Sequence, residues 1–371
     1  MSGSIRFCIF AHSWISDWNH GNAHFLRGLA RELRKLGHEV RCYEELGSWS
    51  LTNLVEQEGE VAVQAIEQFR REFPDLDVRF YQQDEQLRDT LRLELRNADV
   101  AVIHEWNDPE VANTILSLKA ELGFRALFHD THHRALSNAR EILRFDLGHF
   151  DGVLAFGEAI TRIYLEGFGV QRAWTFHEAA DATNFYPRDG PADIDVLWIG
   201  NWGDEERTGE LAEFLIEPLA KLRNCKTVVH GVRFPDKGIE VLQQAGIEYR
   251  GYLPNLSAPE LYSRSVLSLH VPRRQYSNGL QGVPTIRVFE ALACGAPLIC
   301  APWHDAEGLF QPGEDYVVVA SGAEMQAEIQ HLIRDESARR QIGAHGRDTI
   351  LRRHTCAHRA QQLVAICEEL A

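Results

Sequence analysis

The sequence has no long apolar run and no leader-like start. No stretch of about 18 apolar residues occurs, so we expect no transmembrane helix. The N-terminal run SIRFCIFA is short, reaches polar residues too soon for a signal peptide and has no cleavage site of small residues. We therefore expect a cytoplasmic protein with at most peripheral membrane contact.

Paired cysteines and an excess of basic residues are also missing. The seven cysteines are scattered, odd in number and never in Cys-x-x-Cys spacing, which is typical of reduced thiols. We expect neither a disulfide nor a metal site. The formal net charge is −16 at pH 7, whereas nucleic-acid binding relies on clustered Lys and Arg. We expect no nucleic-acid partner.

What is present indicates two α/β domains. The 371 residues exceed one ordinary hydrophobic core. Strand-like runs alternate with helical segments such as 51–72 and 108–122, which predicts parallel sheets. A turn-rich stretch near residues 184–193 marks the linker. The expected parts are an N-terminal domain (1–187), a C-terminal domain (188–350) and a last helix (351–371).

The segment GVPTIRVFEALACGAPLICAP (residues 282–302) predicts a helix followed by a strand. Pro284 suits the start of this helix and Gly295 its end. The free backbone N–H groups and the positive dipole end of a first turn favour a phosphate. The residues of this turn are Thr285, Ile286 and Arg287, and Arg287 can add a bidentate contact.

Glu290 lies on the otherwise apolar face of the same predicted helix. A buried carboxylate is costly without hydrogen-bond donors, and the two hydroxyls of a ribose could supply them. The segment is therefore a candidate seat for a nucleoside diphosphate. An i,i+3 pair between Arg287 and Glu290 explains the spacing equally well.

The loop after the first strand carries small and polar residues. Gly21 permits a close backbone approach at the entrance of the following helix, which suits a phosphate or a transferred sugar. A plain connecting loop is the alternative. The polar side chains here are candidates for contact with an acceptor: Asp17, His20, Asn22 and His24.

A second polar run, FHDTHHRALS (residues 128–137), follows another predicted strand. Histidine titrates near neutral pH, and an aspartate can orient it, so the run could remove a proton from an acceptor hydroxyl. The candidate catalytic residues are His129, Asp130 and His132, with His133 as a further acceptor-side candidate. A zinc or manganese site here, joined by His104 and Glu105, is a weaker alternative.

The segment 282–302 resembles the donor-binding motif of family 4-like GT-B glycosyltransferases (glycosyltransferase group 1), and most closely that of the CgeB-type, spore-maturation-protein-like branch. The run RIYLEGFGV, followed by EAADATNFYP, is similar to the inter-domain passage of this family through Asp181, Phe185 and Pro187. The resemblance covers nearly the whole chain.

This resemblance implies an α/β protein of GT-B architecture, with two Rossmann-like domains facing each other across a cleft and a last helix that packs back on the first domain. It also implies metal-independent transfer of a hexosyl or related group. The donor is a nucleoside-diphosphate sugar, most simply a UDP-sugar, and the acceptor is an unidentified small molecule, glycan or glycolipid. No other cofactor is expected.

The resemblance also assigns roles to single residues. Glu290 would bind the donor ribose, and the backbone of Thr285 and Ile286 its pyrophosphate. Asn201 and Arg207 stand near positions where the family carries an Arg and a Lys for the diphosphate, and Gly251, Tyr252 and Leu253 match the loop that contacts the base. One departure is Gly282, which replaces a glutamate that the family usually has.

Two further functions fit the same architecture. A nucleotide-sugar epimerase would convert the sugar nucleotide without an acceptor. A non-catalytic protein of polysaccharide or spore-coat assembly would bind a nucleotide or glycan and transfer nothing. A third alternative is a metallohydrolase built on the histidine run, which would lose its activity with a chelator.

Overall fold

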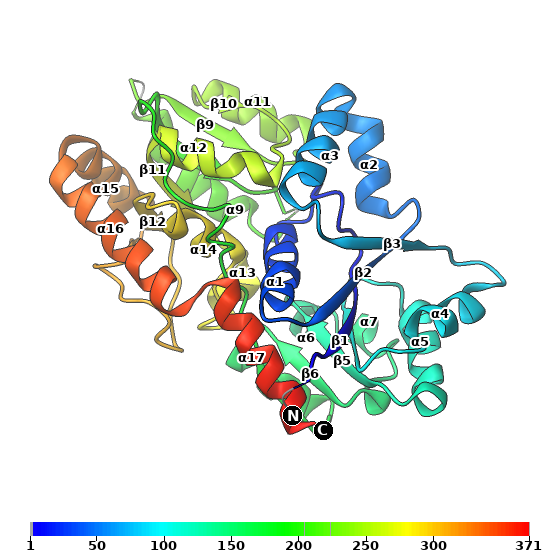
Figure 1. Cartoon of the computed structure of the whole chain (residues 1–371). Coiled ribbons are helices and arrows are strands. Elements are labelled where there is room, and N and C mark those ends of the chain that lie inside the picture. Colours follow the sequence, from blue (N-terminus) through cyan, green and yellow to red (C-terminus); the bar gives the residue numbers. More distant parts are fainter. Residues whose placement is uncertain (1–2, 204, 223, 371) are drawn as a thin grey trace. The chain divides into compact units, whose positions relative to one another are not determined.

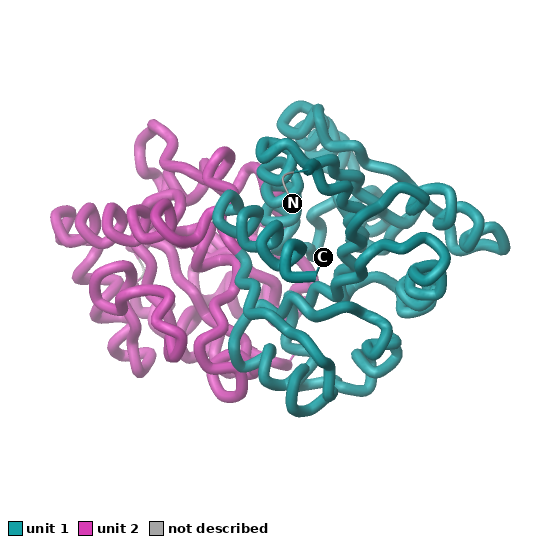
Figure 2. The backbone as a smooth tube through the Cα atoms, turned by 60° about the horizontal axis from the view of Figure 1, so that its bottom comes forward, with its two compact units in different colours: residues 1–178, 356–371 teal, residues 179–355 magenta. Residues whose placement is uncertain are grey.

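The structure is a computed structural model, which describes residues 3–203, 205–222 and 224–370. The chain divides into two compact units (Figure 2): unit 1 comprises residues 1–178 and 356–371, and unit 2 comprises residues 179–355. The sequence placed these boundaries at 187/188 and 350/351. The linker that we expected near residues 184–193 lies within unit 2.

Unit 1 contains a sheet in which all strand pairs are parallel. Its strands are β1 (Arg6–Phe10), β2 (Glu39–Glu45), β3 (Asp77–Tyr81), β4 (Val100–His104), β5 (Arg125–Asp130), β6 (Gly152–Ala155) and β7 (Ala173–Thr175). They lie in the order β3-β2-β1-β4-β5-β6-β7. A parallel neighbour needs a crossover connection, and the helical segments of the sequence provide it.

The helices of unit 1 are α1 (Ala23–Lys35), α2 (Trp49–Glu58), α3 (Glu60–Glu72), α4 (Leu87–Leu95), α5 (Pro109–Leu122), α6 (Arg134–Ser137), α7 (Ala139–Ile142), α8 (Glu158–Arg162) and α17 (Cys356–Glu369), with a 3-10 segment (Leu147–His149) and a π-helical segment (Ile163–Gly167). The single helix expected over 51–72 is in fact two, because Gly59 interrupts it with a φ of +54°. The last helix, α17, packs along α1 (Figure 1).

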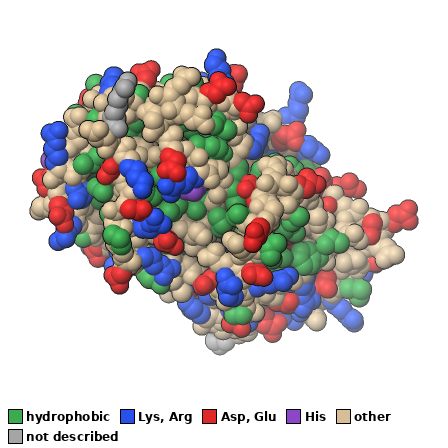
Figure 3. Space-filling model, turned by 90° about the horizontal axis from the view of Figure 1, so that it is seen from above, with side chains coloured by type: hydrophobic (Ala, Val, Ile, Leu, Met, Phe, Trp, Pro, Cys, Tyr) green, Lys and Arg blue, Asp and Glu red, His purple; other side chains and the backbone are tan. Residues whose placement is uncertain are grey.

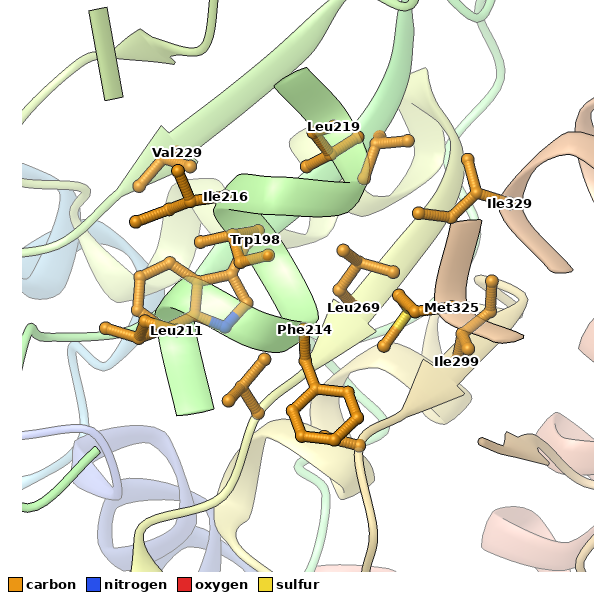
Figure 4. Close-up of a cluster of buried hydrophobic side chains, with 14 of the residues drawn as sticks. Trp198, Leu211, Phe214, Ile216, Leu219, Val229, Leu269, Ile299, Met325 and Ile329 are labelled. Atoms are coloured by element: carbon orange, nitrogen blue, oxygen red, sulfur yellow. The ribbon is translucent and has the colours of Figure 1, made fainter. Parts of the chain in front are cut away.

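Unit 2 contains a second parallel sheet. Its strands are β8 (Ile194–Ile199), β9 (Thr227–His230), β10 (Glu248–Tyr249), β11 (Ser265–His270), β12 (Leu298–Cys300) and β13 (Val317–Val318). They lie in the order β10-β9-β8-β11-β12-β13. The sheet is the centre of a buried cluster in which Trp198, Leu269 and Ile299 pack with Phe214 and Met325 (Figure 4).

The helices of unit 2 are α9 (Thr208–Leu211), α10 (Glu217–Ala220), α11 (Asp236–Gln244), α12 (Ala258–Arg264), α13 (Arg274–Asn278), α14 (Ile286–Ala293), α15 (Gly322–Arg334) and α16 (Glu336–Arg353), with a π-helical segment (Ala212–Ile216) and a 3-10 segment (Asn255–Ser257). Each sheet has one point at which the strand order reverses. In unit 1 it lies between β1 and β4, and in unit 2 between β8 and β11. Parallel sheets bind ligands beyond the carboxyl ends of the strands at such points.

Two surface properties bear on the class of protein. Among the described residues, none of the helices has the length and apolar character that a membrane span requires. On the face shown in Figure 3, Lys and Arg side chains are interspersed with Asp and Glu.

Candidate functional site

The loop after β8 places Arg207 at the strand-order reversal of unit 2. Its guanidinium donates hydrogen bonds to backbone carbonyl oxygens, to Trp202 O at 3.3 Å, Val271 O at 3.0 Å and Asn201 O. Its Cζ lies 5.1 Å from the centre of the Trp198 ring. Among the described residues, no carboxylate lies within hydrogen-bond distance of this guanidinium, so the charge of Arg207 is not paired directly.

Two further arginines raise the positive potential around Arg207. Burial, together with the charges of Arg273 and Arg287, lowers the pKa of Arg207 to about 9. A Cβ atom at Gly203 would lie 3.2 Å from Nε of Arg207 and 3.4 Å from Nε of Arg273, so both side chains approach this glycine. Arg273 itself pairs with Glu206 at 2.9 Å. The arrangement favours an anion.

Helix α14 begins beside these arginines. Thr285 is its N-cap residue in an extended conformation, and its first turn contains no acidic residue. The hydroxyl of Thr285 lies 2.9 Å from Nε2 of His270 at the end of β11. Burial and the charges of Arg207 and Arg287 lower the pKa of His270 to about 3, so this imidazole is neutral at pH 7. The helix terminus adds its own preference for an anion.

Glu290 is completely buried on α14, and three protein groups donate to its carboxylate. Asn255 Nδ2 donates to Oε1 at 3.0 Å. Tyr262 OH and Arg287 Nη1 donate to Oε2, at 3.3 and 2.5 Å. The i,i+3 pair with Arg287 is therefore present, and the carboxylate does not need a ribose to satisfy it.

Gly282 precedes α14 with a φ of +91°, a conformation that favours glycine. A Cβ atom there would lie only 2.8 Å from Cγ of Glu307 and 3.2 Å from its backbone N. A side chain at this position would therefore be strained, and Glu307 would have to shift to admit it.

The predicted base-contacting loop, residues 251–253, follows β10. The carbonyl oxygen of Gly251 lies 3.3 Å from Nδ1 of His230, which ties the loop to the end of β9. The side chain of Asn201 joins the same region, because its Oδ1 accepts a hydrogen bond from Val232 N at 3.0 Å. The loops after β8, β9 and β10 are thus connected within unit 2.

In unit 1, buried charges hold the loop after β1 in place. Glu44, at the carboxyl end of β2, accepts hydrogen bonds from Ser13 Oγ at 2.9 Å and Trp14 N at 2.6 Å. Asp17 forms an ion pair with Arg27 at 3.1 Å, and both side chains are buried. The predicted acceptor contact of Asp17 is untested, but here its carboxylate supports the loop.

Histidines from three strand ends meet at the strand-order reversal of unit 1. The ring centre of His12 lies 3.9 Å from that of His20 and 6.1 Å from that of His104, and His104 lies 5.3 Å from His129. Burial lowers the pKa of His12 to about 4 and that of His129 to about 3. These imidazoles are therefore neutral at pH 7.

The remaining candidates of this loop differ in position. Asn22 Nδ2 donates to Thr131 Oγ1 at 2.9 Å, and Thr131 Oγ1 lies 3.0 Å from His104 Nε2, so Asn22 belongs to the histidine group. Gly21 is partly exposed at the entrance of α1. His24 is completely buried on α1.

The predicted catalytic run after β5 is divided between the interior and the surface. His129 is buried against the rings of Phe25 and Phe176. Asp130 is buried as well and accepts hydrogen bonds from Tyr164 OH at 2.6 Å and His132 N at 2.9 Å. Burial raises the pKa of Asp130 to about 6. Asp130 thus fixes the backbone that carries His132.

His132 is the partly exposed histidine of this run, whereas His133 is buried with Nδ1 2.8 Å from Ser137 Oγ. The ring of His132 packs edge-on against Trp106, with centres 5.1 Å apart. Trp106 follows β4, and 43% of its surface is exposed. Of the predicted catalytic residues, His132 is the one with access to a ligand.

Sequence reasoning gave no catalytic or donor role to a glutamate and an arginine that lie together beside Trp106. Glu105 is completely buried and accepts a hydrogen bond from Arg134 Nε at 2.9 Å. The Arg134 guanidinium carbon lies 3.9 Å from the centre of the Trp106 ring. Burial and the charge of Asp130 raise the pKa of Glu105 to about 8, against the effect of Arg134.

Two other residues of these sites were not predicted, although their positions after strands could have indicated them. His12 lies two residues beyond β1, and Arg273 lies three residues beyond β11, where the strand-end rule directs attention. Within the described part of the chain, no group of three or more His, Cys, Asp or Glu side chains is arranged to hold a metal ion. The metal alternative for residues 128–137 therefore has no geometric support.

Residues 207–365 match a protein family described as glycosyl transferase-like. This stretch includes Arg207, Arg273, Arg287 and Glu290, but it is less than half of the chain. No curated protein sequence matches the chain.

Several solved structures are similar over nearly the whole chain. An alpha-glucosyltransferase in complex with UDP and a 13-mer DNA has a TM-score of 0.71 at 14% identity, covering 99% of this chain and 100% of its own. HepE of Anabaena in complex with UDP-glucose has a TM-score of 0.68 at 14% identity, and the match covers 98% of this chain and 100% of HepE. Sucrose-phosphate synthase of Thermosynechococcus elongatus has 0.67 at 14%, covering 99% of each chain.

These matches do not distinguish the CgeB-type branch, which stays a prediction. Identities this low establish the fold and not the substrate. The expected α/β class is confirmed: the chain has the GT-B fold with two Rossmann-like units, and this fold and the family match together support glycosyl transfer.

Proposed function

We propose that the protein transfers a hexosyl or related group from a nucleoside-diphosphate sugar to an acceptor hydroxyl, without a metal ion. The observation that carries the proposal is Arg207, a partly buried guanidinium held by carbonyl oxygens beside two further arginines. UDP-sugars are the first donors to test, because similar structures contain UDP and UDP-glucose.

The donor diphosphate would occupy the carboxyl ends of β8 and β11 in unit 2. As the sugar leaves, negative charge develops on the diphosphate. Arg207, Arg273 and Arg287, together with the free N–H groups of Thr285, Ile286 and the first turn of α14, would stabilise this charge in place of a cation. Residues 251–253 would contact the base.

Unit 1 would supply the acceptor side of the reaction. Trp106 offers a partly exposed aromatic ring beside His132, which suits contact with the C–H groups of a sugar. His132 is the first candidate for a base because it is partly exposed, whereas His129 is buried among aromatic rings. Asp130 would act through the His132 backbone.

A thermal-shift screen tests the proposal. UDP, GDP, dTDP, ADP and CMP are added with and without magnesium to the wild type and to Arg207→Met. We expect UDP to raise the melting temperature of the wild type without magnesium, and not that of the variant. If no nucleotide stabilises the wild type, the proposal is wrong. Conversion of the donor without an acceptor would indicate an epimerase instead.

A further inference from the structure

Thr285 begins α14 in the backbone conformation of a capping residue, but its side chain does not cap the helix. Its φ of −82° and ψ of 159° are extended, and its hydroxyl makes no capping hydrogen bond. A threonine at this position usually accepts a hydrogen bond from the second or third N–H group of the helix. Four other helices of the chain are capped in this way, by Ser48, Asp108, Ser321 and Asp335. The open start of α14 therefore has a local cause.

His270 supplies this cause. It is the last residue of β11, only 4% of its surface is exposed, and its Nε2 lies 2.9 Å from Thr285 Oγ1. Its Nδ1 has no hydrogen-bond partner among the described residues, so the polar contact of this ring is with Thr285. The hydroxyl that would cap α14 is thus held at the end of β11.

The surroundings of this contact are positive. The charges of Arg207 and Arg287 both act on His270, so the two guanidinium groups lie near the end of β11 and the start of α14. The same charges and burial keep the imidazole neutral at pH 7, which makes it a hydrogen-bonding group and not a further cation. A helix start without a cap, beside two cations, suits an anion.

We propose that His270 is a positioning residue for the donor diphosphate. It holds the Thr285 hydroxyl away from α14 and so keeps the N–H groups of the first turn open for phosphate oxygens. Without His270 the hydroxyl turns to its own helix and competes with the diphosphate for these N–H groups. This inference rests on the proposed function, because it concerns the same donor.

A pair of variants and their combination test this role. Binding of UDP and of inorganic pyrophosphate is measured by calorimetry with the wild type, His270→Phe, Thr285→Val and the double variant. We expect His270→Phe to weaken binding of both ligands about fivefold, the usual strength of a cap, because the released hydroxyl caps α14. Thr285→Val alone should change binding by less than about twofold, since the hydroxyl does not cap the wild-type helix.

The double variant gives the decisive result. With no hydroxyl left to compete, its affinity should return to within about twofold of the wild type, so that a second substitution repairs the first. A residue that merely supports the fold would not be repaired in this way. If the double variant binds no better than His270→Phe, the inference is wrong.

Two other results would also overturn it. An unchanged affinity of His270→Phe would mean that the hydroxyl is not released. A loss in Thr285→Val as large as that in His270→Phe would mean that the hydroxyl itself contacts the diphosphate. All of these results leave the proposed function intact, whereas a wild type that binds no nucleotide removes both.

Thermal unfolding without ligand is an independent measurement. Thr285→Val should lower the melting temperature in the His270→Phe background, where it removes a cap, and hardly at all in the wild type. Equal shifts in both backgrounds would contradict the inference. Ser321→Ala is the matched control: Ser321 Oγ accepts a hydrogen bond from Glu324 N at 3.3 Å, so its loss should lower the melting temperature and leave UDP affinity unchanged. If His270→Phe does not fold, His270→Leu takes its place with the same expected pattern.

Discussion

The two strand-order reversals of this protein have opposite electrostatic character. In unit 2, Arg207, Arg273 and Arg287 surround the ends of β8 and β11. In unit 1, neutral histidines such as His12 and His104 occupy the ends of β1 and β4. Two sheets of the same kind thus present a positive site in one unit and an uncharged site in the other.

The same physical effect produces both results. Burial disfavours the charged form of every cation, so it lowers the pKa of Arg207 to about 9 and that of His12 to about 4. The ordinary pKa of arginine is far above 7, so Arg207 remains charged at pH 7, whereas the ordinary pKa of histidine is near 7 and His12 becomes neutral. The same effect of burial therefore leaves the arginine site charged and the histidine site neutral at pH 7.

The strongest test of this comparison is Arg207→Met. Loss of one preorganised donor to developing charge typically costs about 100- to 1,000-fold in rate, and we expect a loss of that size in transfer. UDP binding should weaken as well. Both are measured with the sugar nucleotide that stabilises the wild type.

Arg274→Met is the control for this experiment. Arg274 also lies beyond β11, but it is exposed and pairs with Glu210 at 2.8 Å. We expect it to retain wild-type binding. Equal losses in both variants would mean that general positive charge, and not Arg207 in particular, binds the donor.

His129→Phe tests the neutral state of unit 1. An unfolded histidine binds a proton below about pH 6.5, whereas His129 does so only near pH 3, so its folded state loses stability as the pH falls. Between pH 7 and pH 5 this amounts to about 2 kcal/mol. Phenylalanine keeps the contacts with Phe25 and Phe176. When the pH falls from 7 to 5, the free energy of unfolding of the variant should therefore fall by about 2 kcal/mol less than that of the wild type.

Urea unfolding at both pH values measures this difference. The carboxyl groups of Glu105 and Asp130 act in the opposite sense, since their raised pKa values favour the folded state at low pH. They are present in both proteins and do not affect the comparison. His331→Gln, at an exposed position of α15, serves as the control. An unchanged acid sensitivity of His129→Phe would mean that His129 takes up its proton in the folded state as readily as in the unfolded chain.

Trp106→Ala tests whether unit 1 binds the acceptor. We expect the acceptor KM to rise about tenfold, since an aromatic platform contributes on the order of 1 kcal/mol beyond the area it buries. UDP affinity should not change, because the arginine site belongs to unit 2. The acceptor is the first sugar that the wild type glycosylates in a panel of mono- and disaccharides.

Trp49→Ala is the matched control for Trp106. Trp49, on α2, is also exposed in unit 1, but it packs against Trp18. A change in UDP affinity with unchanged acceptor KM would assign Trp106 to the donor. The same change in both variants would indicate an effect on the fold of unit 1.

Sequence reasoning predicted the fold correctly, and it proposed the donor segment, for local reasons. Strand and helix alternate in the chain, so the parallel sheets follow from short-range patterns. The first turn of α14 was readable because Pro284, Thr285 and Arg287 are neighbours in sequence. The break at Gly59 was missed because apolar residues continue on both sides of it.

The missing parts of the site are those that long-range contacts create. Asn255 and Tyr262 meet Glu290 only after the chain has folded, from 35 and 28 residues away. Arg134 reaches Glu105 across 29 residues. A histidine run such as 129–133 cannot reveal by itself which ring is buried, because that depends on Phe25, Phe176 and Trp106 from other elements.

The smallest expected effect is that of a chelator. If the arginines of unit 2 balance the charge of the leaving diphosphate, excess EDTA should change the transfer rate by less than about twofold. The first turn of α14 has no acidic side chain that could hold a cation against the diphosphate. Release of UDP from the donor is followed before and after chelation, and again after addition of magnesium or manganese. If EDTA abolishes most of the transfer rate and manganese restores it, a metal ion and not the arginines balances the charge of the diphosphate. The electrostatic contrast between the units would then not explain the reaction.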